Sequence, residues 1–209
     1  MVFVRSIAVG AIEVNPFGIT TDGKYLWWIG SDNDRIYQMD KAGNLIRTIA
    51  IGATDLFAQD ITTDGKYLWW TGRGNNRIYQ MDKAGNLIKS IAVGAIDTKP
   101  RGITTDGKYL WWVGGQNARI YQMDKAGNLI KSIAIGATDA DPFAVTTDGK
   151  YLWWNGMNTN NIYQMNKAGN ISRTIAIGGT DTSPKGMETD GKYLWWCGDI
   201  NNIIVQWAK

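Results

Sequence analysis

A repeat of 42 residues constrains the fold of this chain more than any other feature of its sequence. The segment TDGKYLWW begins at Thr21 and returns unchanged at Thr63, Thr105, Thr147 and Thr189, with no insertion or deletion between the copies. A constant period of this length is typical of architectures in which one small structural unit is repeated and packed against the next. The copies run through nearly the whole chain, so we expect residues 1–209 to form a single domain.

Each copy has the pattern of four short β-strands. In the third copy, apolar and β-branched runs are separated by turn residues, and no window has the periodicity of an amphipathic helix. Asp106-Gly107 is expected to form the first hairpin turn, and Gly127 suits a left-handed bulge position in the last one. Four antiparallel strands in about 40 residues are typical of a propeller blade. The predicted strands are 102–105, 109–113, 119–123 and 129–135.

The two ends of the chain are expected to close the ring. Residues 4–10, VRSIAVG, match the fourth strand of a blade, whereas the last segment, NIIVQWAK, fills the third strand of the fifth blade. Pairing the first strand with the last one completes the fifth blade and leaves no unfinished sheet. The predicted fold is therefore an all-β, five-bladed β-propeller with four antiparallel strands per blade.

The run KPRGITTDGKYLWWVGGQNARIYQMDKAGNLIKSIAIG resembles the NHL and YVTN propeller repeats. The shared pattern is Pro-x-Gly, a short apolar strand, Asp-Gly, an aromatic strand, Asn before a strand, and a final strand like SIAIG. This resemblance implies a propeller that serves as a binding platform for protein, glycan or RNA, and only occasionally as an enzyme. The usual Asp at the end of the second strand is replaced here by Gly30, Gly72, Gly114, Gly156 and Gly198.

Ten of the eleven tryptophans stand in pairs, one pair in the second strand of each copy. Successive residues of a strand point to opposite faces of its sheet, and neighbouring blades cover both faces of a blade. A large aromatic side chain buries roughly 150–250 Å² and dominates the contacts it makes. Each pair is therefore expected to fill two different blade interfaces rather than to hold a ligand.

The five copies differ from one another mainly in two loops. The loop before the first strand reads EVNPF, DLFAQ, DTKPR, DADPF and DTSPK, and the loop after the second strand reads SDND, RGNN, GQNA, MNTN and DINN. In an up-and-down sheet these loops emerge on one face, and the nearly invariant turns on the other. Loops tolerate drift but also carry binding residues, so this variable face is the predicted ligand-binding surface. Its candidate contacts are Phe17, Phe57, Arg101, Phe143 and Lys185 near the mouth of the central channel, with Arg73, Gln116, Met157 and Asp199 from the second loop.

Two sets of carboxylates are weaker candidates. Asp60 and Glu188 interrupt first-strand positions and are expected to face the channel, where paired acids would suit a glycosidase. A second set opens the first variable loop, and a single Asp there usually hydrogen-bonds to backbone rather than binding a hard cation. This second set is Glu13, Asp55, Asp97, Asp139 and Asp181.

Composition excludes several classes of site. The chain has no histidine, so histidine-based triads and zinc–histidine sites are impossible. A net charge of +3 without a run of Lys or Arg argues against nucleic acid, and no apolar stretch approaches the length of a membrane span. The single Cys197 excludes an internal disulfide framework. We predict no cofactor, metal, nucleic-acid or membrane partner, and a soluble chain without a visible signal peptide, whose compartment stays unknown.

From these features we expect a non-catalytic module that binds a glycan or a protein with its variable face. One alternative is an engineered or recently amplified symmetric scaffold with no specific ligand, which the near identity of the copies suggests. Another is a glycoside-active enzyme that uses the channel carboxylates. A monomer is expected, although near-identical blades also permit strand-swapped oligomers.

Overall fold

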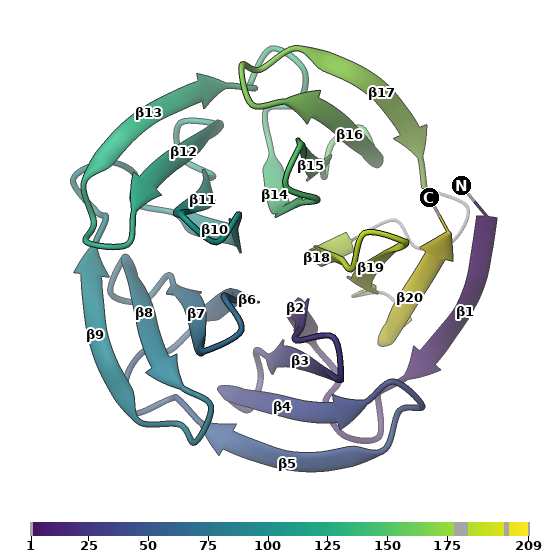
Figure 1. Cartoon of the computed structure of the whole chain (residues 1–209). Helices are drawn as coiled ribbons and strands as arrows, with labels where there is room; N and C mark the ends of the chain where they lie inside the picture. The colour runs from purple at the N-terminus through teal and green to yellow at the C-terminus, as the bar shows by residue number, and fades with distance from the viewer. Residues whose placement is uncertain (1, 178–183, 199–200, 209) are drawn as a thin grey trace.

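The computed structural model describes residues 2–177, 184–198 and 201–208 (Figure 1). Their twenty strands form five four-stranded sheets, and every strand pair in those sheets is antiparallel. The sheets stand around a central axis like the blades of a propeller (Figure 1), which confirms the predicted fold. The described residues contain no helix that is long and apolar enough to cross a membrane.

In blades 1 to 4 the strands follow chain order from the axis outward. Blade 1 consists of β2 (Pro16–Thr21), β3 (Tyr25–Gly30), β4 (Arg35–Asp40) and β5 (Leu45–Ala50). Blade 2 consists of β6 (Ala58–Thr63), β7 (Tyr67–Gly72), β8 (Arg77–Asp82) and β9 (Leu87–Ala92). Blade 3 consists of β10 (Pro100–Thr105), β11 (Tyr109–Gly114), β12 (Arg119–Asp124) and β13 (Leu129–Ala134). Blade 4 consists of β14 (Pro142–Thr147), β15 (Tyr151–Gly156), β16 (Asn161–Asn166) and β17 (Ile171–Ala176).

Blade 5 joins the two ends of the chain. It consists of β18 (Pro184–Thr189), β19 (Tyr193–Gly198), β20 (Ile203–Ala208) and, as its outermost strand, β1 (Val2–Ala8). β1 pairs antiparallel with β20, with Ser6 opposite Val205 and Ile7 opposite Ile204. The N-terminal strand therefore completes the last blade, as predicted, and the two termini lie close together (Figure 1).

The first hairpin of a blade turns one residue later than predicted. The N–H of Asp106 donates to the carbonyl of Tyr109 (3.3 Å), so the central residues are Gly107 and Lys108, and only Gly107 has a positive φ, of +89°. Positive φ at the first central position is the pattern of a type II′ turn. The Asp106 carboxylate accepts hydrogen bonds from the N–H groups of Lys108 and Tyr109 instead. The left-handed Gly127 is confirmed, with φ of +107° beside a bulge in the β12–β13 pairing.

The paired tryptophans fill the interfaces between blades, which confirms their predicted structural role. Trp27 packs with Trp70 between blades 1 and 2, whereas Trp28 packs with Trp195 between blades 5 and 1. The same alternation holds at the other three interfaces. All ten side chains are at most 2% exposed, so none presents a surface to a ligand.

The two tryptophans of a pair are held in different ways. Trp27 donates its indole N–H to the carboxylate of Asp22 in its own hairpin (3.1 Å). The indole N–H of Trp28 has no hydrogen-bond partner within the described part of the chain, and its ring stacks on Tyr37 with 4.2 Å between ring centroids. The second tryptophan therefore contributes to stability through packing alone.

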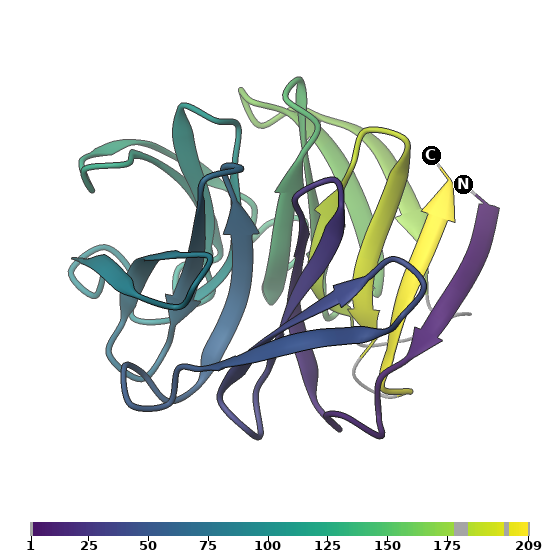
Figure 2. The same cartoon turned by 60° about the horizontal axis from the view of Figure 1, so that its bottom comes forward.

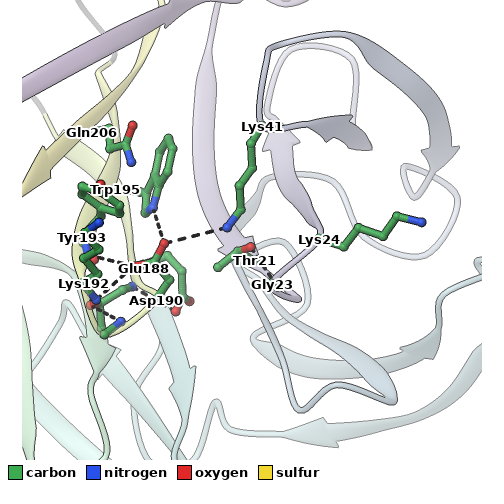
Figure 3. Close-up of polar contacts among 12 residues, drawn as sticks. Thr21, Gly23, Lys24, Lys41, Glu188, Asp190, Lys192, Tyr193, Trp195 and Gln206 are labelled. Atoms are coloured by element: carbon green, nitrogen blue, oxygen red, sulfur yellow. Dashed lines mark hydrogen bonds and ion pairs between the residues drawn. The ribbon is translucent and has the colours of Figure 1, made fainter.

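Hairpin aspartates also link neighbouring blades. Lys83, from the last turn of blade 2, pairs with Asp22 of blade 1 (2.9 Å). Partial burial alone would raise the pKa of Asp22, but hydrogen bonds from Lys83 and from the hairpin lower it to about 2. Figure 3 shows the equivalent arrangement where the ring closes, with Asp190 between Trp195 and Lys41. Each such pair fixes one blade against the next.

Candidate functional site

The two variable loops of a blade lie side by side on one face, which we call the loop face. In blade 1 the N–H of Ser31 donates to the carbonyl of Asn15 (3.1 Å), and in blade 2 Arg73 donates to Phe57 in the same way (3.1 Å). Blades 3 and 4 repeat this contact. The hairpins that join β2 to β3 and β6 to β7 point to the opposite end of the ring (Figure 2). The variable sequence is therefore gathered on one side, as expected.

An acidic residue braces these loops from inside each of blades 1 to 4. The carboxylate of Asp97 accepts hydrogen bonds from the N–H groups of Lys99 (2.9 Å), Gln116 (3.1 Å) and Asn117 (3.0 Å). Its side chain is buried, and so are its equivalents Glu13, Asp55 and Asp139. These acids bind backbone, as the sequence indicated, and they therefore tie the two loops of a blade together. Asp181 lies outside the described residues.

The glycine at the end of the second strand makes room for this carboxylate. A Cβ on Gly114 would fall on the carboxylate of Asp97, well inside van der Waals contact, and would also strike the ring of Tyr121. Gly30, Gly72 and Gly156 face Glu13, Asp55 and Asp139 in the same way. The glycine that departs from the NHL and YVTN pattern thus has a physical cause in this chain, because a side chain there would collide with the loop acid.

Four of the predicted contact residues converge at the mouth of the channel, and we call them the mouth cluster: Phe17, Arg101, Phe143 and Lys185. The rings of Phe17 and Phe143 meet edge to face, with 5.7 Å between centroids. The Lys185 ammonium lies 5.5 Å from the first ring and 4.8 Å from the second, and the Arg101 guanidinium lies 5.0 Å from the second. Cations at this distance from an aromatic face are attracted to it. The cluster therefore combines aromatic surface with positive charge.

Polar contacts orient Arg101 within the cluster. Its Nη1 donates to Oδ1 of Asp141 (2.5 Å) and to the carbonyl of Pro142 (2.8 Å), both at the start of blade 4. The Arg101 side chain is largely buried, whereas the Asp141 side chain is 43% exposed. The guanidinium is thus held at the rim of the mouth by the loop of the next blade.

Blade 2 supplies a cavity on the same face. Its volume is about 410 Å³, and the described residues that line it are Phe57, Arg73 and Gly74. Phe57 is 61% exposed and has φ of +65°, a left-handed conformation that is costly for a bulky side chain. The carbonyl of Phe57 accepts a hydrogen bond from Gln59 Nε2 (3.2 Å), and Gln59 occupies the fifth mouth position. This bond links the loop that lines the cavity to a residue of the mouth, and no sequence pattern identified the strained backbone of Phe57.

The remaining predicted contacts do not join the cluster. Gln116 is exposed, and its backbone N–H is held by Asp97. Met157 is half-buried, with its sulfur 3.7 Å from Nδ2 of Asn155. Asp199 lies outside the described residues. The candidate site therefore consists of the mouth cluster and the adjoining cavity.

Asp60 and Glu188 do not form an accessible pair of acids. Asp60 is fully buried, and its two oxygens accept hydrogen bonds from the N–H groups of Ile61 and Ile103 (2.9 Å each). Glu188 is half-buried and accepts a hydrogen bond from Thr20 Oγ1 (3.0 Å). Because Asp60 is enclosed by backbone, a polysaccharide cannot reach it, and the arrangement does not support the glycosidase alternative.

Burial of Asp60 gives a prediction for the pH dependence of stability. Desolvation raises the pKa of Asp60 well above 3.8, against the backbone hydrogen bonds that it accepts. The folded state therefore keeps a proton that the unfolded chain releases, and it loses stability as the pH rises through the interval between the two pKa values. Asp60→Ala gives blade 2 the alanine that blade 4 carries at this repeat position, Ala144. The variant lacks the carboxylate and therefore does not lose this stability as the pH rises. The free energy of unfolding of Asp60→Ala, relative to that of the wild type, should rise by up to about 1.4 kcal/mol per pH unit in that interval.

Urea unfolding at several pH values above about 4 measures this difference. Asp40→Ala is the control, since hydrogen bonds from Asn44 lower the pKa of Asp40 and give the opposite sign, with stability lost as the pH falls. A difference between Asp60→Ala and the wild type that stays constant with pH would contradict the assignment.

Cys197 is not a candidate nucleophile. It is fully buried in β19, and desolvation raises the pKa of its thiol well above the ordinary value. A reactive cysteine needs the thiolate form and an accessible position. Among the described residues there is also no group of three or more Asp, Glu or Cys side chains placed to hold a metal ion.

Comparisons with known proteins identify the family. The model of the virginiamycin B lyase family matches residues 3–206. Among solved structures, a catalytically inactive virginiamycin B lyase from Staphylococcus aureus with quinupristin is 23% identical, with a TM-score of 0.61 over 93% of this chain and 66% of that chain. This chain therefore spans just under two thirds of that lyase chain. A comparison with curated protein sequences finds no match.

Two further structures share the fold. The glutaminyl cyclase of Myxococcus xanthus is 10% identical, with a TM-score of 0.77 over 98% of this chain and 94% of that chain. A nidogen/laminin complex contains a chain that is 24% identical, with a TM-score of 0.62 over 78% of this chain and 64% of that chain. At these identities the similarity shows the propeller fold alone.

The expectation that this protein is not an enzyme is wrong, because the family that matches is named for a lyase and two of the similar structures are enzymes. The inactive relative carries alanine in place of a histidine, whereas the present chain has no histidine at all. The resemblance to NHL and YVTN repeats holds at the level of the propeller fold. With residues 3–206 matched, the chain belongs to the virginiamycin B lyase family.

Proposed function

We propose that the protein binds a ligand on its loop face, with the mouth cluster at the centre of the site. The convergence of two phenyl rings and two cations, all within 5.7 Å of a ring partner, supports this assignment. Binding sites typically combine apolar surface with a few oriented polar groups. The buried acids under the loops keep this surface preorganised, which lowers the entropic cost of binding.

A peptide or protein segment fits this surface better than a glycan does. Phe57 and Arg73 stand at the cavity beside the mouth, and Phe57 keeps a strained backbone while most of its ring is exposed. Aromatic and arginine side chains are enriched at protein interfaces, and strain of this kind persists where the surroundings impose it, often at ligand sites. A propeller of similar fold occurs in the nidogen/laminin complex. We therefore favour a peptide ligand.

Family membership supports a second candidate, a lyase reaction on the same face. Because the chain has no histidine, proton transfer would fall to other groups, and the charged residues at the mouth include Asp141 and Lys185. Quinupristin, which is present with one of the similar lyases, is the probe. Its conversion, followed by chromatography, should stop with Lys185→Met or Asp141→Asn if this candidate is correct.

Selection of peptides from a displayed library against the purified protein tests the binding proposal. Phe57→Ala and Arg73→Ala change exposed side chains, and we expect each to lower the affinity for the selected peptides about tenfold or more. The control is Lys108→Ala, on the opposite hairpin face, which should leave the affinity unchanged. The binding proposal fails if the library yields no ligand, or if the selected peptides respond to Lys108→Ala rather than to the loop-face changes.

A further inference from the structure

We propose that the mouth cluster recognises a carboxylate on its ligand, and that Thr71 and Asn155 are positioning residues which hold the two cations of the cluster in place. This inference rests on the proposed function, since it names the chemistry of the ligand bound at the mouth.

The two cations of the cluster share one aromatic ring. The guanidinium of Arg101 and the ammonium of Lys185 lie 5.0 and 4.8 Å from the centroid of Phe143. Asp141 already pairs with Arg101 (2.5 Å), so Arg101, Lys185 and Asp141 together carry one net positive charge, which attracts an anion. A third cation, Arg73, stands exposed at the cavity on the same face. The field at the mouth therefore favours a negatively charged group.

Arg101 retains donors for that group. Within the described residues its hydrogen bonds to Asp141 and Pro142 are both made by Nη1, which leaves Nη2 and Nε. A guanidinium and an ammonium are the usual partners of a carboxylate, and charge-assisted hydrogen bonds of this kind are the stronger ones. The rings of Phe17 and Phe143 offer apolar contact beside the charge. A carboxylate next to an aromatic ring is the ligand group that satisfies both.

Polar side chains of the preceding blades hold the strands that carry the cations. Thr71, in β7 of blade 2, donates its hydroxyl to the carbonyl of Arg101 itself. Asn155, in β15 of blade 4, donates Nδ2 to the carbonyl of Pro184 (2.7 Å), the residue before Lys185. Both side chains are fully buried. A buried polar group costs free energy unless it is hydrogen-bonded, so these contacts fix the strand starts.

The same two residues are anchored within their own blades. Thr71 Oγ1 accepts a hydrogen bond from the N–H of Asp60 (3.2 Å), and Asn155 Oδ1 accepts one from the N–H of Ala144 (2.6 Å). Each therefore ties the innermost strand of its own blade to the innermost strand of the next. The backbone that carries each cation is therefore held by a buried side chain of the preceding blade, which is not itself part of the mouth cluster.

Thr71 and Asn155 occupy the same position of the repeat, and a polar residue occurs there only where the next blade carries a cation at the mouth. This position is polar only in blades 2 and 4, each of which precedes a blade with a cation at the mouth. In the other three blades it is apolar and precedes an uncharged mouth residue: Ile29 before Gln59, Val113 before Phe143 and Cys197 before Phe17. The polar side chain and the cation therefore occur together in this chain, at both mouth positions that carry a cation.

A matched pair of small probes tests the proposal on the full chain. N-acetyl-L-phenylalanine carries the carboxylate, and N-acetyl-L-phenylalanine amide is its neutral counterpart. Nuclear magnetic resonance titrations, followed at the backbone N–H groups of Arg101 and Lys185, give the affinity of each probe. We expect the acid to bind about tenfold or more tightly than the amide, with the preference falling as salt is added.

Variants at the two supporting positions test their role. Thr71→Val and Asn155→Val should reduce the acid-over-amide preference about threefold or more, whereas Thr71→Ser, which keeps the hydroxyl, should restore it. Valine already occupies this position as Val113, so these variants are compatible with the fold. Ile29→Val, at the same position in blade 1, is the control and should change nothing.

The outcomes separate this inference from the proposed function. Equal affinity for the acid and the amide, or no binding of either, overturns the carboxylate assignment even where library peptides still depend on Phe57. An unchanged preference in Thr71→Val and Asn155→Val overturns the positioning role. Selective binding of the acid at the mouth, with no peptide recovered from the library, rejects the peptide ligand of the proposed function while the anion site stands.

Discussion

Replacing Trp112 by alanine is expected to lower the free energy of unfolding by about 3–5 kcal/mol. Trp112 is fully buried between blades 2 and 3, where it packs with Trp69 and stacks on Tyr121 with 4.5 Å between centroids. Removal of the indole leaves a cavity that β-strands on both sides cannot fill, because their own hydrogen bonds hold them in place. Urea unfolding followed by circular dichroism measures the loss.

The matched control separates packing from hydrogen bonding. Trp112→Phe removes no hydrogen bond, since the Trp112 N–H has no partner in the described part of the chain. Trp111→Phe breaks the bond to the Asp106 carboxylate (3.1 Å) in addition to its packing loss. The second variant should therefore be less stable than the first by about 1 kcal/mol. Equal stabilities, or the reverse order, would show that the indole N–H groups do not distinguish the two positions.

Deletion of residues 2–8 is expected to cost at least about 5 kcal/mol, which is comparable to the whole stability of an ordinary domain. The deletion removes β1, exposes the edge of β20 and takes Ile7 out of the core between blades 5 and 1. It also removes Arg5, which donates to Gln206 (2.9 Å) and to the carbonyl of Lys41 (2.5 Å) in the next blade. Urea unfolding, with size-exclusion chromatography and light scattering, should show an unstable or associating chain.

A rearranged chain provides the control for this deletion. Ala-Gly-Asn followed by residues 3–8, attached after the last lysine, reproduces the KAGN turn and fourth strand of the other blades. This chain should recover a cooperative monomeric fold, because the sheet needs the strand and not its covalent position. Failure of the rearranged chain to recover would mean that β1 acts through something other than completing blade 5.

Much of the fold could be predicted because the repeat supplies the same local signals five times. The predicted strand 102–105 is β10 shortened by two residues, and the closure by β1 followed from the order of motifs at the two ends. The hairpin was misplaced by one residue because Asp106 was treated as part of the turn. Its carboxylate instead caps the turn from outside, a choice between two roles of Asp that composition does not decide.

The candidate site was only partly predictable. Phe17 and Phe143 share one repeat position, so their convergence at the mouth followed from the symmetry of the ring. The support of Arg101 by Thr71 did not, because this bond joins residues of different blades and depends on the packing between them. The expectation of a non-catalytic protein was wrong because propeller repeats of one pattern serve both binding proteins and enzymes.

The fit between Gly114 and Asp97 restricts the mutational paths open to each blade. While the loop keeps its acid, any side chain at the end of the second strand collides with it, so single substitutions there should destabilise the blade. If the acid is lost first, the loop N–H groups that donate to it lose their hydrogen-bond acceptor. The two positions should therefore tolerate change only as a pair. Blades 1 to 4 of this chain each keep the same combination, a loop acid beside a strand glycine.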